Sequence, residues 1–178
     1  MAKELKDRKD VEEALTWDLS AIYSSEDEYN AAIKELEELA KEIEKEFKGK
    51  LNTAENINKC LDKLRKVTEI IDLTGNYAEL SLSVDHTNSD NVDRYMRFSN
   101  TMAQISSSLS FIDSEIIQGD EGLIDEAIKE SKENRIYLEE IKRAKPHALH
   151  PEAERVLAAL SGTLEAPYSI YEQAKLAD

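Results

Sequence analysis

The stretch "SSEDEYNAAIKELEELAKEIEKEFKGK" (residues 24–50) decides the fold class, because its apolar residues recur in alternating steps of four and three. Ser25 and Glu28 have the spacing of an N-terminal capping box, and Gly49 favours a helix stop. The stretch therefore predicts an amphipathic helix whose charged residues form a solvated face. Its buried stripe is Tyr29, Ile33, Leu36, Ala40, Ile43 and Phe47.

A second helix is predicted to begin after Thr53, which can serve as its cap, and to continue through Leu82. Its buried side is marked by Ile57, Leu61, Leu64 and Ile71. Gly75 inside this pattern weakens a helix by about 1 kcal/mol relative to alanine. We interpret it as the site of a close helix crossing rather than a break.

A third helix is predicted to begin near Asn88 or Ser89, after a turn of cap-forming residues at 85–91. It should run without interruption for roughly thirty residues, about 45 Å, to the QGDEG segment at 118–122. Its heptad-like seam consists of Tyr95, Phe98, Met102, Ile105, Leu109, Ile112 and Ile116.

Shorter helices follow over residues 123–130 and 135–143. The pair Lys145-Pro146 should end the second of them, because the residue before a proline avoids helical dihedral angles. Pro151 then suits the first position of another helix, whose inward residues should be Ala153, Val156, Leu157 and Leu160. With no competing strand pattern, the predicted fold is all-α: an elongated bundle of long antiparallel helices followed by shorter C-terminal helices.

Three regions are expected along the 178 residues. Residues 1–16 form a polar N-terminal extension, and residues 17–145 form the helical bundle. Residues 146–178 comprise a hinge and the start of a connection to a further domain.

Charge limits the classes of partner. The 23 basic and 38 acidic residues give a net charge of −15, which disfavours nucleic acid and anionic membranes. The single cysteine, Cys60, allows no internal disulfide and is expected to be a small buried residue. No signal peptide or membrane-spanning run is present, so a cytoplasmic location is expected.

Catalytic and metal-binding motifs are absent from the sequence. His147 and His150 have H-x-x-H spacing, but Pro151 follows at once and His147 precedes the predicted helix. The two rings are therefore not fixed on one helical face. There is no H-E-x-x-H, nucleophile elbow or phosphate loop. We assign no catalytic residue and no metal ligand.

Two stretches of this highly charged chain are almost neutral. Residues 98–112 carry no charged side chain and residues 73–84 carry only Glu79, and the two should face each other across the turn at 85–91. A tightly packed helix pair explains part of this. The alternative is that the neutral faces extend to a partner surface. The candidate surface residues are Tyr77, Ser81, Phe98, Ser106, Ser107, Ser110 and, at the hinge, His147.

Four segments together carry a resemblance to a known family. They are "TWDLSAIYSSEDEY" (16–29), "YAELSLSVDHT" (77–87), "SFIDSEI" (110–116) and "KRAKPHALHPEAERVLAAL" (142–160). In this order and spacing the chain resembles the N-terminal helical region of oligoendopeptidase F, in the thimet oligopeptidase-like metallopeptidases. One position departs from the family pattern, since His150 stands where a serine or threonine cap is expected.

The resemblance implies that the parent protein is a cytoplasmic, zinc-dependent endopeptidase acting on short peptides. In that family an H-E-x-x-H helix and a further glutamate bind zinc in a later domain, and the N-terminal helices form one wall of a deep channel. None of the zinc ligands lies in this sequence, so no catalytic role transfers to any residue here. The implied partners are the missing catalytic domain and, in the whole enzyme, short peptides.

Two other readings stay open. The chain could be an autonomous helical interaction module that pairs with a partner or with itself as a homo-oligomer. A metal-binding bundle is a weaker third possibility, because only the H-x-x-H pair supports it.

Overall fold

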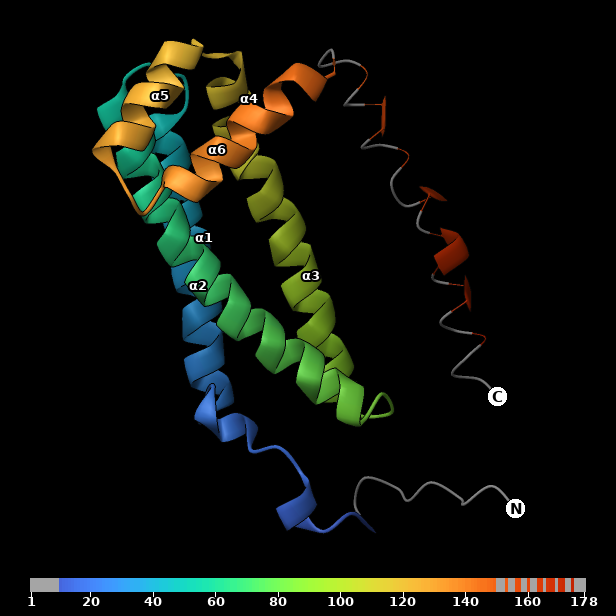
Figure 1. Cartoon of the computed structure of the whole chain (residues 1–178). Helices are drawn as coiled ribbons and strands as arrows, with labels where there is room; N and C mark the ends of the chain where they lie inside the picture. Colours follow the sequence, from blue (N-terminus) through green and yellow to red (C-terminus); the bar gives the residue numbers. More distant parts are fainter. Residues whose placement is uncertain are drawn as a thin grey trace. The chain divides into compact units, whose positions relative to one another are not determined.

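The computed structural model describes residues 10–149 and, beyond them, residues 153, 156, 157, 160, 163, 164, 166–168, 170, 171 and 174. It divides into two compact units, Met1–Ile141 and Lys142–Asp178. All regular structure in the described residues is helical, which confirms the all-α prediction. In the first unit, Figure 1 shows the long helices α1, α2 and α3 with the shorter α4 and α5 near one end.

The first helix, α1 (Glu26–Phe47), follows two 3-10 turns, η2 (Glu13–Leu15) and η3 (Leu19–Ala21). Ser25 caps it by accepting from the Glu28 amide at 3.2 Å. The Glu28 carboxylate in turn accepts from the backbone amide of Ser24 at 2.8 Å, one residue further back than in an ideal capping box. The predicted stripe is confirmed, with five of its residues buried and Ile33 half-buried.

The second helix, α2 (Ala54–Val84), is a single helix of 31 residues with Thr53 as its N-cap. Gly75 lies where α3 approaches: an ideal Cβ built on it would stand 2.9 Å from the Phe98 ring tip. The predicted close crossing at this glycine is confirmed. Another link between the two helices is made by Asn91, whose side-chain amide donates to the Ser81 carbonyl at 2.8 Å.

The third helix does not run without interruption as predicted. It is divided at Ser110 into α3 (Ser89–Leu109) and α4 (Phe111–Gln118). The Ser110 hydroxyl donates to the Ser107 carbonyl at 2.9 Å, a local bond that competes with the helical ladder and favours a bend. After the break Phe111 and Ile112 are buried in the core, so the seam itself persists.

The core joins α1, α2 and α3 to α5 (Glu121–Glu130), and α2 contacts each of the other three. Leu138 and Ile141 of α6 (Arg135–Ala144) complete it. The two short helices and the break at Lys145-Pro146 are as predicted, since the 3-10 turn η4 (Lys145–His147) follows α6 directly. Among the described residues no helix is long and apolar enough to cross a membrane.

A buried polar node ties the loop between α5 and α6 to α2. Asn134, 3% exposed, donates to the side-chain oxygens of Asn58 and Asp62, both at 3.1 Å. Arg65 donates to the Asn134 side-chain oxygen at 2.5 Å, and Asn58 donates to the Ala127 carbonyl at 3.0 Å. These directional bonds fix the loop's position on α2 in a way that apolar packing alone does not.

In the second unit one prediction is wrong. Ala153, Val156, Leu157 and Leu160 were expected to face inward, but all four are exposed, Val156 to 56%. The start of their helix at Pro151 and the side chain of His150 lie outside the described residues.

The contact between Gly75 and Phe98 makes a testable prediction. Gly75→Ala should stabilise a Phe98→Leu variant by about 1 kcal/mol. Alanine has the higher helix propensity, and the shorter leucine side chain removes the clash between the new methyl group and the Phe98 ring. In the wild-type background the same change should give less stability or a loss, because the ring must move. Urea unfolding of the wild type, of each single variant and of the double variant gives the effect of Gly75→Ala on the free energy of unfolding in both backgrounds. Equal gains in both backgrounds would contradict the proposed contact.

The polar node makes a second prediction. Asn134→Ala should lower the free energy of unfolding by about 1–3 kcal/mol, because buried Asn58 loses its hydrogen-bond donor and the loop loses its bonds to α2. Asn76→Ala is the matched control, since exposed Asn76 bonds to the Asp72 carbonyl of its own helix. Thermal and urea unfolding should separate the two variants clearly; similar stabilities would show that the node is dispensable.

Candidate functional site

One hollow of the first unit is lined by residues of α2, α3 and α4 together with Tyr137; it has a volume of about 280 Å³ and is called here the α2–α3 groove. Its floor is apolar and comes from α2, α3 and α4, while Ser106 and Ser110 stand at its edge. Among the described residues that line it, Asp113 alone is charged. The full lining is Leu64, Val67, Ile71, Met102, Ile105, Ser106, Leu109, Ser110, Ile112, Asp113 and Tyr137.

Tyr137 of α6 and Asp113 of α4 are joined at the groove. The Tyr137 hydroxyl donates to the Asp113 carboxylate at 2.5 Å. Burial, followed by the hydrogen bond to Asp113, raises the pKa of Tyr137 well above its ordinary value. The phenol therefore stays protonated at neutral pH and holds the carboxylate in place as a donor.

A second hollow of about 170 Å³ adjoins the groove, because Leu64 and Tyr137 line both. It also contains Arg65, whose guanidinium is engaged by Asn134 and by Asp62 at 3.3 Å. Tyr137 therefore borders both hollows, the second of which also has the polar residues Thr68, Glu133 and Asn134 in its lining.

The structure separates the residues predicted for a partner surface. Ser106 and Ser110 line the α2–α3 groove, and Ser107 is exposed on the same helix as Ser106. Phe98 is half-buried against Gly75. His147 is exposed in η4, in the second unit.

Tyr77 and Ser81 face the interior of the bundle instead. The Tyr77 ring lies 5.5 Å from that of Tyr23 and 5.3 Å from that of Tyr29, with the Arg94 guanidinium 5.3 Å away. Ser81 is buried and its hydroxyl donates to the Tyr77 carbonyl at 2.6 Å. Tyr77 thus packs α2 against Tyr29 of α1, while the Ser81 hydroxyl bonds within α2 itself.

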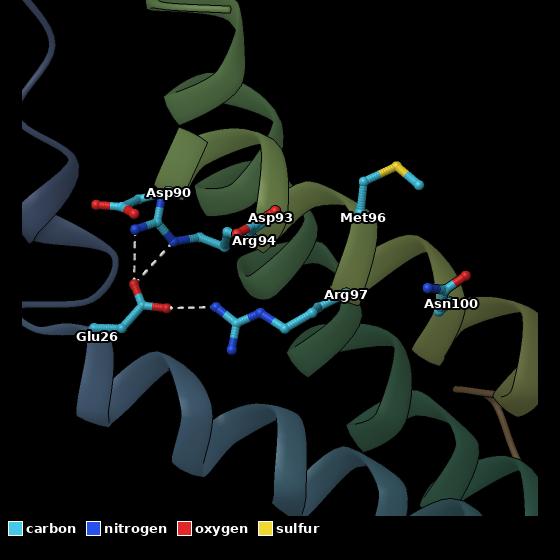
Figure 2. A pocket seen from close by; sticks show the side chains of 7 residues that line it. All are labelled: Glu26, Asp90, Asp93, Arg94, Met96, Arg97 and Asn100. Atoms are coloured by element: carbon cyan, nitrogen blue, oxygen red, sulfur yellow. Dashed lines mark hydrogen bonds and ion pairs between the residues drawn. The ribbon is translucent and has the colours of Figure 1, made fainter. Parts of the chain in front are cut away.

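A charged cluster links the start of α1 to α3 beside a hollow of about 560 Å³ (Figure 2). Glu26 accepts from Arg94 Nε at 2.9 Å and Nη2 at 2.7 Å, and its other oxygen accepts from Arg97 at 3.0 Å. Partial burial would raise the pKa of Glu26, but the hydrogen bonds and charges of the two arginines outweigh it, and the pKa is lowered.

Because both guanidinium groups already bind Glu26, this cluster is not an open anion site. Asp90 and Asp93 also line the hollow, and their charge opposes the approach of an anion. The arrangement fastens α1 to α3 rather than presenting a ligand site.

Metal-binding chemistry finds little support in the described part of the chain. No group of three His, Cys, Asp or Glu side chains is arranged there to hold an ion. His86 and His147 are exposed, and His150 lies outside the described residues.

Sequence reasoning missed the pair Asp113 and Tyr137, and also Glu26 with its arginines. Asp113 falls just after the neutral stretch 98–112, and Tyr137 is 24 residues away. Asp113 is followed by Ser114 and Glu115, and Tyr137 stands in a helix rich in charged residues, so no local pattern sets either residue apart or pairs them.

Comparison with known proteins gives consistent matches. The family model for Oligopeptidase F matches residues 115–178. An oligoendopeptidase F homolog of Borreliella burgdorferi is 31% identical over 96% of this chain, and oligopeptidase PepF of Bacillus subtilis is 29% identical over 92%. The plasmid-encoded oligoendopeptidase F of Lactococcus lactis subsp. cremoris is 22% identical over 94%.

This chain spans 29%, 25% and 28% of the length of those three relatives. A solved structure, that of a peptidase from Chlamydophila abortus, has the same fold over 92% of this chain and 28% of its own, with a TM-score of 0.70 and 19% identity. Taken together, the matches show that the chain is similar to the N-terminal helical region of the oligoendopeptidase F family.

Proposed function

We propose that this chain is the N-terminal part of a zinc-dependent endopeptidase that hydrolyses short peptides. In this proposal it shapes or caps the substrate channel and supplies no catalytic residue. The observation that carries the proposal is the match to named oligoendopeptidases over 92–96% of this chain but only 25–29% of their length.

The zinc of the proposed parent enzyme does not fit the residues described here, because no set of three suitable ligands comes together among them. In the proposal the metal is bound by residues outside this chain. When bound there, it would supply an activated water for peptide hydrolysis. The role left to this chain is to position elements around the substrate.

The partner surface belongs to the same proposal. Ser106, Ser107, Ser110 and the exposed His147 are the predicted residues whose exposure suits contact with the remaining domain. Phe98 is only half-buried and could contribute an apolar edge. Tyr77 and Ser81 would act indirectly, by fixing the helices that carry this surface.

The proposal is tested by comparing the chain of residues 1–178 with the product of the complete reading frame. We expect the short chain to bind no stoichiometric zinc and to leave a quenched short peptide uncut. The complete protein should contain zinc and cleave the peptide, and a chelator should abolish that cleavage. Metal content by mass spectrometry and fluorescence of the peptide measure both properties.

Two results would contradict the proposal. One is a natural reading frame that ends at residue 178 and encodes a chain that self-associates, which would favour an autonomous interaction module. The other is zinc-dependent cleavage by the short chain itself, which would place the active site among the residues assigned here a supporting role.

A further inference from the structure

The α2–α3 groove has an apolar floor that the first unit itself leaves open. Its edge on the α3 side consists of Ser106 and Ser110, both exposed, and its end is formed by Tyr137. Small side chains at the edge allow another backbone to approach closely. The groove therefore has the form of a docking site for a further secondary-structure element.

The element that fits this docking site is a helix. The backbone groups in the middle of α2 and α3 are already used in their own helical ladders. An extended segment laid on the apolar floor would bring amide and carbonyl groups that find no partner there, which is costly. A helix brings a backbone that is already satisfied, together with an apolar stripe that matches the floor.

Charge indicates what the helix should carry. Of the groove-lining residues that the structure describes, Asp113 is the one with a charge, and the Tyr137 hydroxyl holds it in place. A lysine or arginine on the incoming helix would find a preplaced carboxylate at the end of an otherwise neutral docking site.

A second copy of this chain is a poor occupant. Each copy carries a net charge of −15, so association is opposed by long-range repulsion. An isologous contact through this groove would also bring two Asp113 carboxylates toward one interface, and none of the described lining residues is a cation that could pair with them. The relatives, in contrast, are several times longer than this chain, which covers 29% and 25% of two of them, and this leaves ample sequence to supply a helix.

We propose that the α2–α3 groove receives an amphipathic helix from the part of the complete peptidase outside this chain, and that Asp113 pairs with a basic residue of that helix. This inference rests on the proposed function. It specifies where the rest of the enzyme contacts this chain, that the contacting element is a helix, and that this helix carries a basic residue.

Thiol labelling of a Ser106→Cys variant tests the inference in the complete protein and in the chain of residues 1–178. The native thiol interferes little, because Cys60 is fully buried and burial raises its pKa to about 12. Glu38→Cys, on the exposed face of α1, is the matched control. We expect maleimide to label position 106 about tenfold or more slowly in the complete protein than in the short chain, with labelling at position 38 unchanged.

The charge is tested by adding Asp113→Asn or Asp113→Lys to the Ser106→Cys complete protein. Both should speed labelling at position 106, and lysine should do so more strongly. Asparagine keeps an acceptor for Tyr137, so a faster rate in that variant reports the lost charge rather than a lost hydrogen bond. Circular dichroism verifies that each variant is folded, and Ser110→Cys serves as a second reporter.

Peptide cleavage by the same complete protein reports on the proposed function separately. Cleavage with equal labelling at position 106 in the long and short chains would overturn the groove inference and leave the proposed function standing. Protection of position 106 that appears in the short chain and rises with its concentration would assign the groove to a second copy, and so also overturn it. Protection that is insensitive to both Asp113 substitutions would overturn the proposed charge pairing.

Discussion

The first unit depends on one long, unbroken helix. α2 contacts α1, α3, α5 and η3, so its 31 residues must present compatible surfaces on several sides at once. This explains why a glycine is tolerated at position 75, where about 1 kcal/mol of helix stability is given up and the Phe98 ring comes close to the backbone. A side chain there would push α3 away, and the groove that α2 and α3 form with α4 would change with it.

Apolar stripes bring the helices together, but polar bonds set how they are placed. Apolar contacts are weakly directional, so a helix could slide or rotate on α2 at small cost. The hydrogen bonds of Asn134 fix the position of the loop before α6 on α2. The Glu26–Arg94–Arg97 cluster fixes the position of α1 relative to α3. As α6 carries Tyr137, the node also positions the hydroxyl that holds Asp113. The groove is thus built by packing and oriented by a few hydrogen bonds.

The helices themselves could be predicted because their signals are local. Caps at Ser25 and Thr53, the stripe of α1 and the stop at Pro146 all lie within a few residues of the boundary they define. The division at Ser110 was not predicted, because the apolar seam continues across it and only a serine hydroxyl distinguishes the break. Asp113 and Tyr137 could not be paired from sequence, because their contact depends on the fold of α5 and the loop before α6. The inward face expected at Val156 failed for a different reason: periodicity identifies an apolar face but not the surface that covers it.

The uncharged surface of α3 is informative, because charged side chains at its exposed positions would cost the isolated first unit little stability. In a chain with 34% charged residues, exposed helical positions such as Ser106 and Ser107 could carry lysine or glutamate without disturbing the bundle. Serine has no helix-propensity advantage over them. A charged side chain destabilises such a surface only when another element covers it and desolvates the charge. A serine hydroxyl can be covered with a much smaller loss of free energy if it bonds to a nearby carbonyl. Ser110 already has that bond, to the Ser107 carbonyl. The neutral edge of the groove is therefore suited to being covered by another element. Asp113 at its end would favour an element that carries a basic residue.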